Sequence, residues 1–138
     1  MSNFKKIDHL GIAVADLQSA VQKYEVLLQT KATHFEEVLE QKVKTAFFEL
    51  GESHIELLEA TSEESPIAKY LSKNPKGGIH HICIEVEDIE QALKDYQTAG
   101  IRLIDQKPRL GAHDKLVAFV HPADTNGVLI ELSQSQKH

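Results

Sequence analysis

The sequence predicts an α+β fold made of two tandem βαβββ modules. Two observations support this prediction: the chain repeats itself, and each copy has the pattern of a strand, a helix and three further strands. The segment DHLGIAVADLQSAVQKYEVLL begins at Asp8 and resembles HHICIEVEDIEQALKDYQTAG, which begins at His80. Their offset is 72 residues, which places His9 over His81. Such self-similarity indicates two copies of one structural unit.

A second pair of segments extends the repeat. ESHIELLE, residues 52–59, resembles GVLIELSQ, residues 127–134, and places Glu56 over Glu131 at an offset of 75. A chain of 138 residues is most simply one domain. We therefore expect a single domain over residues 1–138, with module one at about 5–60, a connector helix region at about 61–77 and module two at about 78–134.

The first strand and the helix of each module have clear local signals. HLGIAV and HICIEV are rich in β-branched and aliphatic residues, which is typical of strands. Asp16 and Asp88 follow these strands and suit the N-cap position of a helix. Apolar residues then recur at helical spacing in both copies, and Gly100 suits the end of the second helix.

The remaining elements follow from similar signals. In the connector, Ser65 and Pro66 suit an N-cap and a first helical position, so PIAKYLSK is predicted to be a short helix. Further strands are expected at 33–39, 43–50 and 54–59 in module one, and at 101–106, 115–120 and 128–133 in module two.

Composition argues against several kinds of partner. The net charge of −6 argues against nucleic acid, which usually requires a basic face. No apolar run reaches the length that crosses a membrane, and MSNFKKIDHL has no apolar signal core, so we expect a cytoplasmic protein. The one cysteine, Cys83, is interpreted as a small hydrophobic core residue in a reducing compartment.

The repeated histidines and glutamates predict a metal site. A single histidine in an apolar strand is more often a core residue, and a single glutamate near a strand end is more often solvated. Here a histidine in an apolar strand and a glutamate near a strand end occur at matching positions in both copies, which favours metal ligands. Two imidazoles and two carboxylates bind divalent Co, Zn, Mn, Ni or Fe without selecting strongly among them. The candidate ligands are His9, Glu56, His81 and Glu131.

Three further histidines are interpreted differently. Neighbouring side chains on a strand point to opposite faces, so His80 is expected to point away from His81. His34 and His54 have no matching histidine in the second copy, and we expect both at the surface.

Five segments together resemble the vicinal-oxygen-chelate superfamily, which includes glyoxalases, extradiol dioxygenases, fosfomycin-resistance proteins and methylmalonyl-CoA epimerases. In this order they are similar to the epimerases above all, over nearly the whole chain. The resemblance implies a glyoxalase-like fold with an eight-stranded open barrel, usually within a homodimer, and the same four metal ligands. Some family members have Gln at the position of Glu56. The segments are IDHLGIAV, GESHIELLEATSEESPIAKYL, GGIHHICIEVEDI, GIRLIDQKPRLGAH and FVHPADTNGVLIEL.

The resemblance also implies an activity, namely metal-dependent epimerisation of methylmalonyl-CoA at C2. A divalent ion that binds the thioester oxygen stabilises the enolate as a base removes the C2 proton. Glu131 is the candidate catalytic base, and a pure ligand role for Glu131 fits the sequence equally well. The expected partner is a small acyl-CoA, with no role for nucleic acid or membrane.

Two positions depart from the family pattern. Several epimerases carry a second glutamate where this chain has Thr45. The second proton-transfer group is therefore open: Glu49 on the same strand face, a metal-bound water, or one carboxylate that reaches both faces of the substrate. Related epimerases also commonly have Gly where Asp114 stands.

Residues for substrate binding are suggested by the same resemblance. Arg109 and Lys115 flank a loop that the family places near the site, and such cations would attract the CoA phosphates to an acidic protein. The backbone N–H groups of Gly111 and Ala112 are candidates for holding the substrate carboxylate.

Two other functions remain open from the sequence. One is a glyoxalase-type isomerase or lyase that acts on a hemithioacetal with the same four ligands. The other is a metal-free small-molecule-binding module of the same fold, which the four intact ligand positions argue against.

Overall fold

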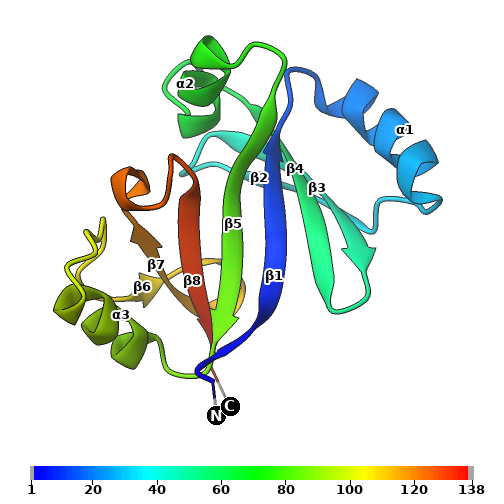
Figure 1. Cartoon of the computed structure of the whole chain (residues 1–138). Coiled ribbons are helices and arrows are strands. Elements are labelled where there is room, and N and C mark those ends of the chain that lie inside the picture. The colour runs from blue at the N-terminus through cyan, green and yellow to red at the C-terminus, as the bar shows by residue number, and fades with distance from the viewer. Residues whose placement is uncertain (1, 137–138) are drawn as a thin grey trace. The chain divides into compact units, whose positions relative to one another are not determined.

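The structure is a computed structural model and describes residues 2–136. The chain forms two compact units (Figure 1). We call His9–His80 the N-terminal unit, and we call the segment from His81 onward, with the residues up to Asp8, the C-terminal unit. The element order β1, α1, β2, β3, β4, then α2, then β5, α3, β6, β7, β8 confirms the α+β class and the two βαβββ modules. The single domain over the whole chain stays an expectation.

The N-terminal unit is a mixed sheet in the order β2-β3-β4-β1. The strands β2 and β3 are antiparallel, as are β3 and β4, whereas β4 and β1 are parallel. The expected strand at 43–50 is confirmed, and the other two agree within one residue at each end. The elements are β1 (Phe4–Ala13), α1 (Leu17–Leu28), β2 (His34–Val38), β3 (Val43–Leu50), β4 (Ser53–Ala60) and α2 (Pro66–Lys73).

Alternation along β3 and β4 separates the two faces of this sheet. Ala46, Phe48 and Leu57 are fully buried and pack against α1. Burying a side chain the size of Phe48 or Leu57 contributes about 1.5–3 kcal/mol. The residues in between, such as Phe47 and Glu56, must face the other side. Because Ala46, Phe48 and Leu57 face α1, the side chains that can form a site lie on the opposite face of the sheet.

Helix α2 packs near one end of that other face. Its residue Ile67 is buried against Ala13 of β1, Val43 of β3 and Leu58 of β4. The helix begins as predicted, because the Ser65 hydroxyl accepts a hydrogen bond from the Ile67 N–H at 3.2 Å.

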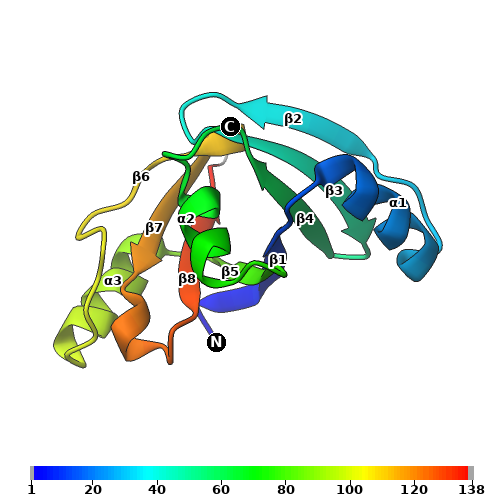
Figure 2. The same ribbon diagram turned by 90° about the horizontal axis from the view of Figure 1, so that it is seen from above.

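The C-terminal unit repeats this plan with strand order β1-β5-β8-β7-β6. Strands β5 and β8 are parallel, and β8, β7 and β6 are antiparallel to their neighbours. Ile89 and Leu93 of α3 pack on Ala118 and Leu132, beside β7 and β8 (Figure 2). The elements are β5 (Gly78–Val86), α3 (Ile89–Thr98), β6 (Arg109–Leu110), β7 (Lys115–Val120) and β8 (Leu129–Ser135), with short 3-10 turns at Ala112–Asp114 and Pro122–Asp124.

The two long helices begin differently. Asp88 is a true N-cap, since its carboxylate accepts the Gln91 N–H at 3.1 Å. Asp16 occupies the N-cap position of α1 but makes no side-chain cap bond. Instead, Glu59 Oε1 accepts the Leu17 N–H at 2.6 Å.

The strand expected at 101–106 is wrong. Between residues 101 and 108 the structure has one isolated bridge, from Leu103 to Val120, and β6 begins at Arg109. The cause is a side chain. Asp105 Oδ2 accepts the Phe119 N–H at 2.9 Å, so that a carboxylate replaces the backbone carbonyl that a continuing ladder would need.

Candidate metal centre

The N-terminal unit pairs His9 with Glu56. His9 lies on β1 beside β4, and its Nε2 is 3.4 Å from Glu56 Oε2. Both side chains are largely buried, with exposed fractions of 11% and 15%. Glu56 lies between the helix-facing residues Ile55 and Leu57, so the pattern of β4 directs its carboxylate away from α1.

His54 shares the same carboxylate, which corrects the expectation that it is a surface residue. Its Nε2 lies 2.9 Å from Glu56 Oε2, and its ring stacks on that of His9 with centroids 4.8 Å apart. The repeat gave no sign of it, because the equivalent residue in the second copy is Leu129. The available signal was strand alternation, since residues 54 and 56 of one strand face the same side.

The C-terminal unit holds the equivalent pair. His81 on β5 places its Nε2 3.8 Å from Glu131 Oε1 on β8, and the side chains are 11% and 14% exposed. Cys83 lies directly across from Glu131 in the strand register and is 1% exposed. Burial, and next the negative charge of Glu131, raise the pKa of the Cys83 thiol far above its usual value. The thiol is therefore neutral, as expected of a core cysteine.

The donor atoms of each unit suit a divalent cation. An imidazole nitrogen and a carboxylate oxygen are ligands that first-row divalent ions accept. Two atoms bound to one ion at about 2.1 Å lie about 3.0–3.4 Å apart. The His9–Glu56 separation of 3.4 Å matches this value, and the His81–Glu131 separation of 3.8 Å is slightly wider. Each unit therefore contains a candidate half of a metal site.

The other two histidines have different surroundings. The ring of His80 meets Tyr70 edge-on with centroids 5.5 Å apart, and burial lowers the pKa of His80. His34 is exposed, as expected, and its Nε2 lies 3.1 Å from Glu36.

Thr45 stands where several related epimerases carry a glutamate, so no carboxylate is present at this position to transfer a proton. Thr45 is buried, and its hydroxyl donates to the Glu36 carbonyl at 3.2 Å. Glu49, the substitute considered from the sequence, is exposed at the far end of β3.

The two cations predicted to bind substrate are already engaged. The guanidinium of Arg109 lies 5.6 Å from the centre of the Phe119 ring, and its Nε is 3.3 Å from Asp105. Lys115 Nζ lies 3.4 Å from Asp8, whose side chain is 9% exposed. Phe119 is the register partner of Glu131, so Arg109 is on the glutamate side of this sheet.

The loop between β6 and β7 contains two unusual backbone positions. His113 and Asp114 both have positive φ, 58° and 61°. Glycine adopts such a conformation at less cost, which agrees with the glycine that related epimerases commonly have at Asp114. The Gly111 N–H donates to the Lys115 carbonyl at 2.7 Å, and Ala112 begins the 3-10 turn. Gly111 would have to give up this bond to hold a substrate carboxylate.

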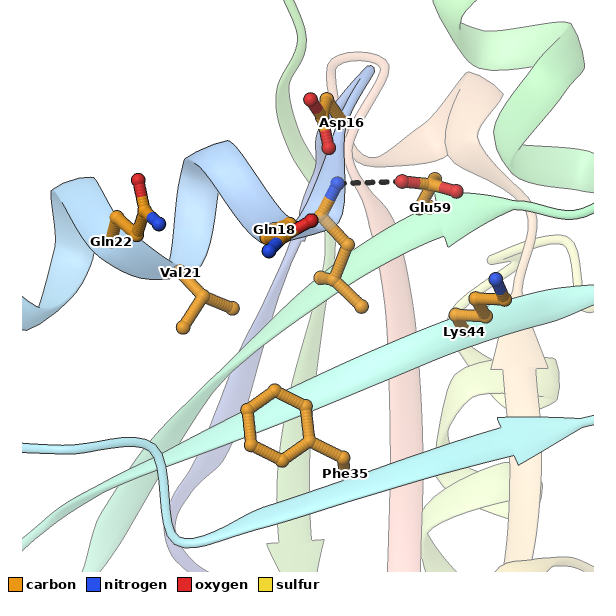
Figure 3. Close-up of a pocket in the computed structure, with 8 residues that line it drawn as sticks. Asp16, Gln18, Val21, Gln22, Phe35, Lys44 and Glu59 are labelled. Atoms are coloured by element: carbon orange, nitrogen blue, oxygen red, sulfur yellow. Dashed lines mark hydrogen bonds between the residues drawn. The ribbon is translucent and has the colours of Figure 1, made fainter.

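A separate depression of about 560 Å³ lies against α1 in the N-terminal unit (Figure 3). Glu59 borders it together with Lys44 and Phe35, and the bond from the Leu17 N–H to Glu59 crosses its rim. Glu59 and Lys44 are on the helix side of the sheet, opposite to Glu56. This depression is therefore distinct from the His9–Glu56 pair.

Among residues 2–136, none of the helices has the length and apolar character that crossing a membrane requires.

Comparisons with known proteins show a superfamily match and similar epimerases. The family model of the glyoxalase/bleomycin resistance protein/dioxygenase superfamily matches residues 8–119. The ethylmalonyl-CoA/methylmalonyl-CoA epimerase of Cereibacter sphaeroides is 44% identical over 94% of this chain and 97% of its own length. The mitochondrial methylmalonyl-CoA epimerase of Dictyostelium discoideum is 42% identical over 94% of this chain and 78% of its own.

Solved structures give the same picture. A hypothetical protein from Bacillus halodurans C-125 has a TM-score of 0.90 at 42% identity, covering 99% of this chain and 98% of its own. The methylmalonyl-CoA epimerase of Mycobacterium tuberculosis has a TM-score of 0.88 at 32% identity, covering 99% and 92%. A variant of the Streptomyces coelicolor methylmalonyl-CoA epimerase in complex with 2-nitronate-propionyl-CoA has a TM-score of 0.85 at 36% identity, covering 96% and 95%.

Proposed function

We propose that this chain interconverts the two C2 stereoisomers of methylmalonyl-CoA. It belongs to the methylmalonyl-CoA epimerases of the glyoxalase/bleomycin resistance protein/dioxygenase superfamily. The observation that carries the proposal is the repeated pairing of a buried histidine with a glutamate, His9 with Glu56 and His81 with Glu131. We further propose that these four side chains hold one divalent ion.

The reaction needs a base and a way to stabilise negative charge. The C2 hydrogen of methylmalonyl-CoA is acidified by the thioester, whereas the neighbouring carboxylate opposes further negative charge. When bound, the divalent ion supplies a Lewis acid that stabilises the charge developing on the thioester oxygen. Glu131 is the proposed base that accepts the C2 proton, since it carries a largely buried carboxylate beside His81, and carboxylates serve as general bases.

The proton must return on the opposite face of C2. The Thr45 hydroxyl donates to a backbone carbonyl and carries no basic group, so we assign the return to water or to Glu131 itself. Turnover in D₂O separates these two routes. Partial retention of the original hydrogen in early product would indicate that Glu131 returns it, whereas full deuterium incorporation would show that the returned hydrogen comes from solvent.

We propose that the anionic groups of the substrate, its phosphates and its carboxylate, bind at the β6–β7 region. Arg109 lies on the Glu131 side of its sheet and keeps a half-exposed guanidinium, with 51% of the side chain exposed. Lys115 contributes a second cation, held by Asp8. The backbone N–H of Ala112, with that of Gly111, would hold the substrate carboxylate. We also propose that the protein forms a homodimer and is located in the cytoplasm. The Dictyostelium relative, in contrast, is named as mitochondrial.

One experiment tests the function directly. The protein, loaded with Co²⁺, is incubated with a single stereoisomer of methylmalonyl-CoA and a mutase that accepts only the other, and C2 exchange in D₂O is followed by NMR. We expect both mutase product and exchange. No exchange, alongside turnover of a glutathione hemithioacetal, would replace the epimerase with a glyoxalase-type enzyme. Protein purified without chelator that contains no metal would favour a metal-free binding module.

A further inference from the structure

We propose that His54 is a positioning residue that holds the Glu56 carboxylate in place beside His9. The inference rests on the proposed function, because it assigns His54 a role at the metal site proposed there. Neither the repeat nor the family resemblance selects this residue, and its role follows from the contacts of three side chains in the N-terminal unit.

The first step is the hydrogen bond between His54 and Glu56. His54 Nε2 lies 2.9 Å from Glu56 Oε2. An ionised carboxylate can only accept hydrogen bonds, so the imidazole nitrogen must be the donor. The same Oε2 lies 3.4 Å from His9 Nε2. His54 therefore fixes the oxygen atom that faces the candidate ligand His9.

The second step is that the His54 ring is itself held. It stacks on His9 with an interplanar angle of 27°, and on its other side it contacts Phe47 with centroids 5.6 Å apart. Its side chain is 19% exposed. A donor with a ring fixed between two others loses little conformational freedom when it binds the carboxylate, so the position of Glu56 is set before any ion arrives.

The third step is the contrast with the second copy. At the offset that aligns Glu56 with Glu131, the residue aligned with His54 is Leu129, which has no side-chain donor. The imidazole–carboxylate separation is 3.8 Å in that unit and 3.4 Å in the unit that contains His54. The added donor accompanies the closer pair, which agrees with a positioning role.

The test measures ion binding as well as catalysis. Co²⁺ is titrated into the metal-free full chain by calorimetry and by the visible absorption of bound cobalt. His54→Leu, which introduces the residue of the second copy, should weaken Co²⁺ binding by about 10–100-fold. His54→Gln keeps a donor and should bind within about fivefold of the wild type. At saturating Co²⁺, we expect His54→Leu to recover most of the wild-type kcat.

The control is His121→Leu, which removes an exposed histidine outside the N-terminal unit and should leave Co²⁺ affinity within about twofold. If His54→Leu does not fold, His54→Phe keeps the ring contacts and faces the same criterion. The proposal is overturned if the donor-free variant binds Co²⁺ as the wild type does. It is also overturned if His54→Gln loses as much affinity as His54→Leu, since His54 would then be a ligand itself. A wild-type chain that binds no Co²⁺ would instead contradict the proposed function.

Discussion

The two units of this chain build the same pair in two environments. In the N-terminal unit, His9 and Glu56 are joined by a third side chain, His54, that binds the glutamate. In the C-terminal unit, His81 and Glu131 are accompanied by a buried, neutral thiol, Cys83. The repeat thus conserves the donor atoms and varies what surrounds them. This difference suggests unequal roles for the two glutamates, both of which are proposed ligands: Glu56 is held by His54, whereas Glu131 is also the proposed base.

The sharpest test of equivalence removes each histidine in turn. His9→Ala and His81→Ala should each lower divalent-ion affinity by at least about 100-fold and abolish C2 exchange, because each removes one of four proposed ligands. Metal content after dialysis, measured by mass spectrometry, checks the result. His80→Ala is the control and should retain most of its metal, since His80 contacts Tyr70. Full metal content in His81→Ala would mean that the site must be redrawn.

The second test separates the two glutamates. Glu131→Gln should lower the exchange rate by about 10²–10⁴-fold, because an amide cannot accept the C2 proton. Glu56→Gln should lose about tenfold or less, since an amide oxygen still offers a ligand atom and some family members have Gln there. Single-stereoisomer turnover at saturating Co²⁺ measures both. Equal losses in the two variants would argue against a special role for Glu131.

The third test concerns the helix starts. Asp88→Ala should lower the free energy of unfolding by about 1 kcal/mol, because the Gln91 N–H loses its cap. Asp16→Ala should change it by less than about 0.5 kcal/mol, because Glu59 already accepts the Leu17 N–H. Urea unfolding of both variants provides the comparison. A larger loss for Asp16→Ala would show that Asp16 has a role beyond the one its contacts indicate.

The smallest expected effect concerns an exposed pair in the C-terminal unit. Arg102 donates to both oxygens of Asp124, and this lowers the Asp124 pKa from 3.8 to about 2. The stabilisation is therefore present above about pH 4 and is lost as the pH falls through about 2. In Arg102→Gln, the Asp124 pKa should rise toward its ordinary value but stay below it, because the backbone N–H of residue 102 still donates to Asp124 Oδ2 at 2.7 Å; NMR can measure this shift. An unchanged Asp124 pKa would show that Arg102 is not the cause.

The repeat made much of this molecule predictable. Ser65 with Pro66 correctly marked a helix start, and the strands expected at 43–50 and 115–120 are observed as β3 and β7. The failures came from side chains that act on distant backbone. Asp105 interrupts the expected strand by accepting the N–H of a residue 14 positions away, and Glu59 accepts the first N–H of a helix 42 positions earlier. Such bonds leave no local periodicity for a sequence reader to detect.

The site shows the same division. His9, Glu56, His81 and Glu131 were selected because both copies contain them, and the structure pairs them within each unit. His54 was missed because Leu129 broke the symmetry on which that selection relied. A repeat reveals what two copies share and is silent on what one copy has gained.

The registers of β4 and β8 have a further consequence. Three residues after Glu56, Glu59 points to the opposite face and binds the start of α1; three residues after Glu131, Gln134 binds the Ile89 N–H at 2.8 Å. A slip of β4 or β8 by one residue would turn the acid of the site toward the helix and remove the bond that this strand makes to the first N–H of the helix. Mispaired folding intermediates are thus penalised twice, so that the chemistry and the correct assembly of the sheet depend on one alignment.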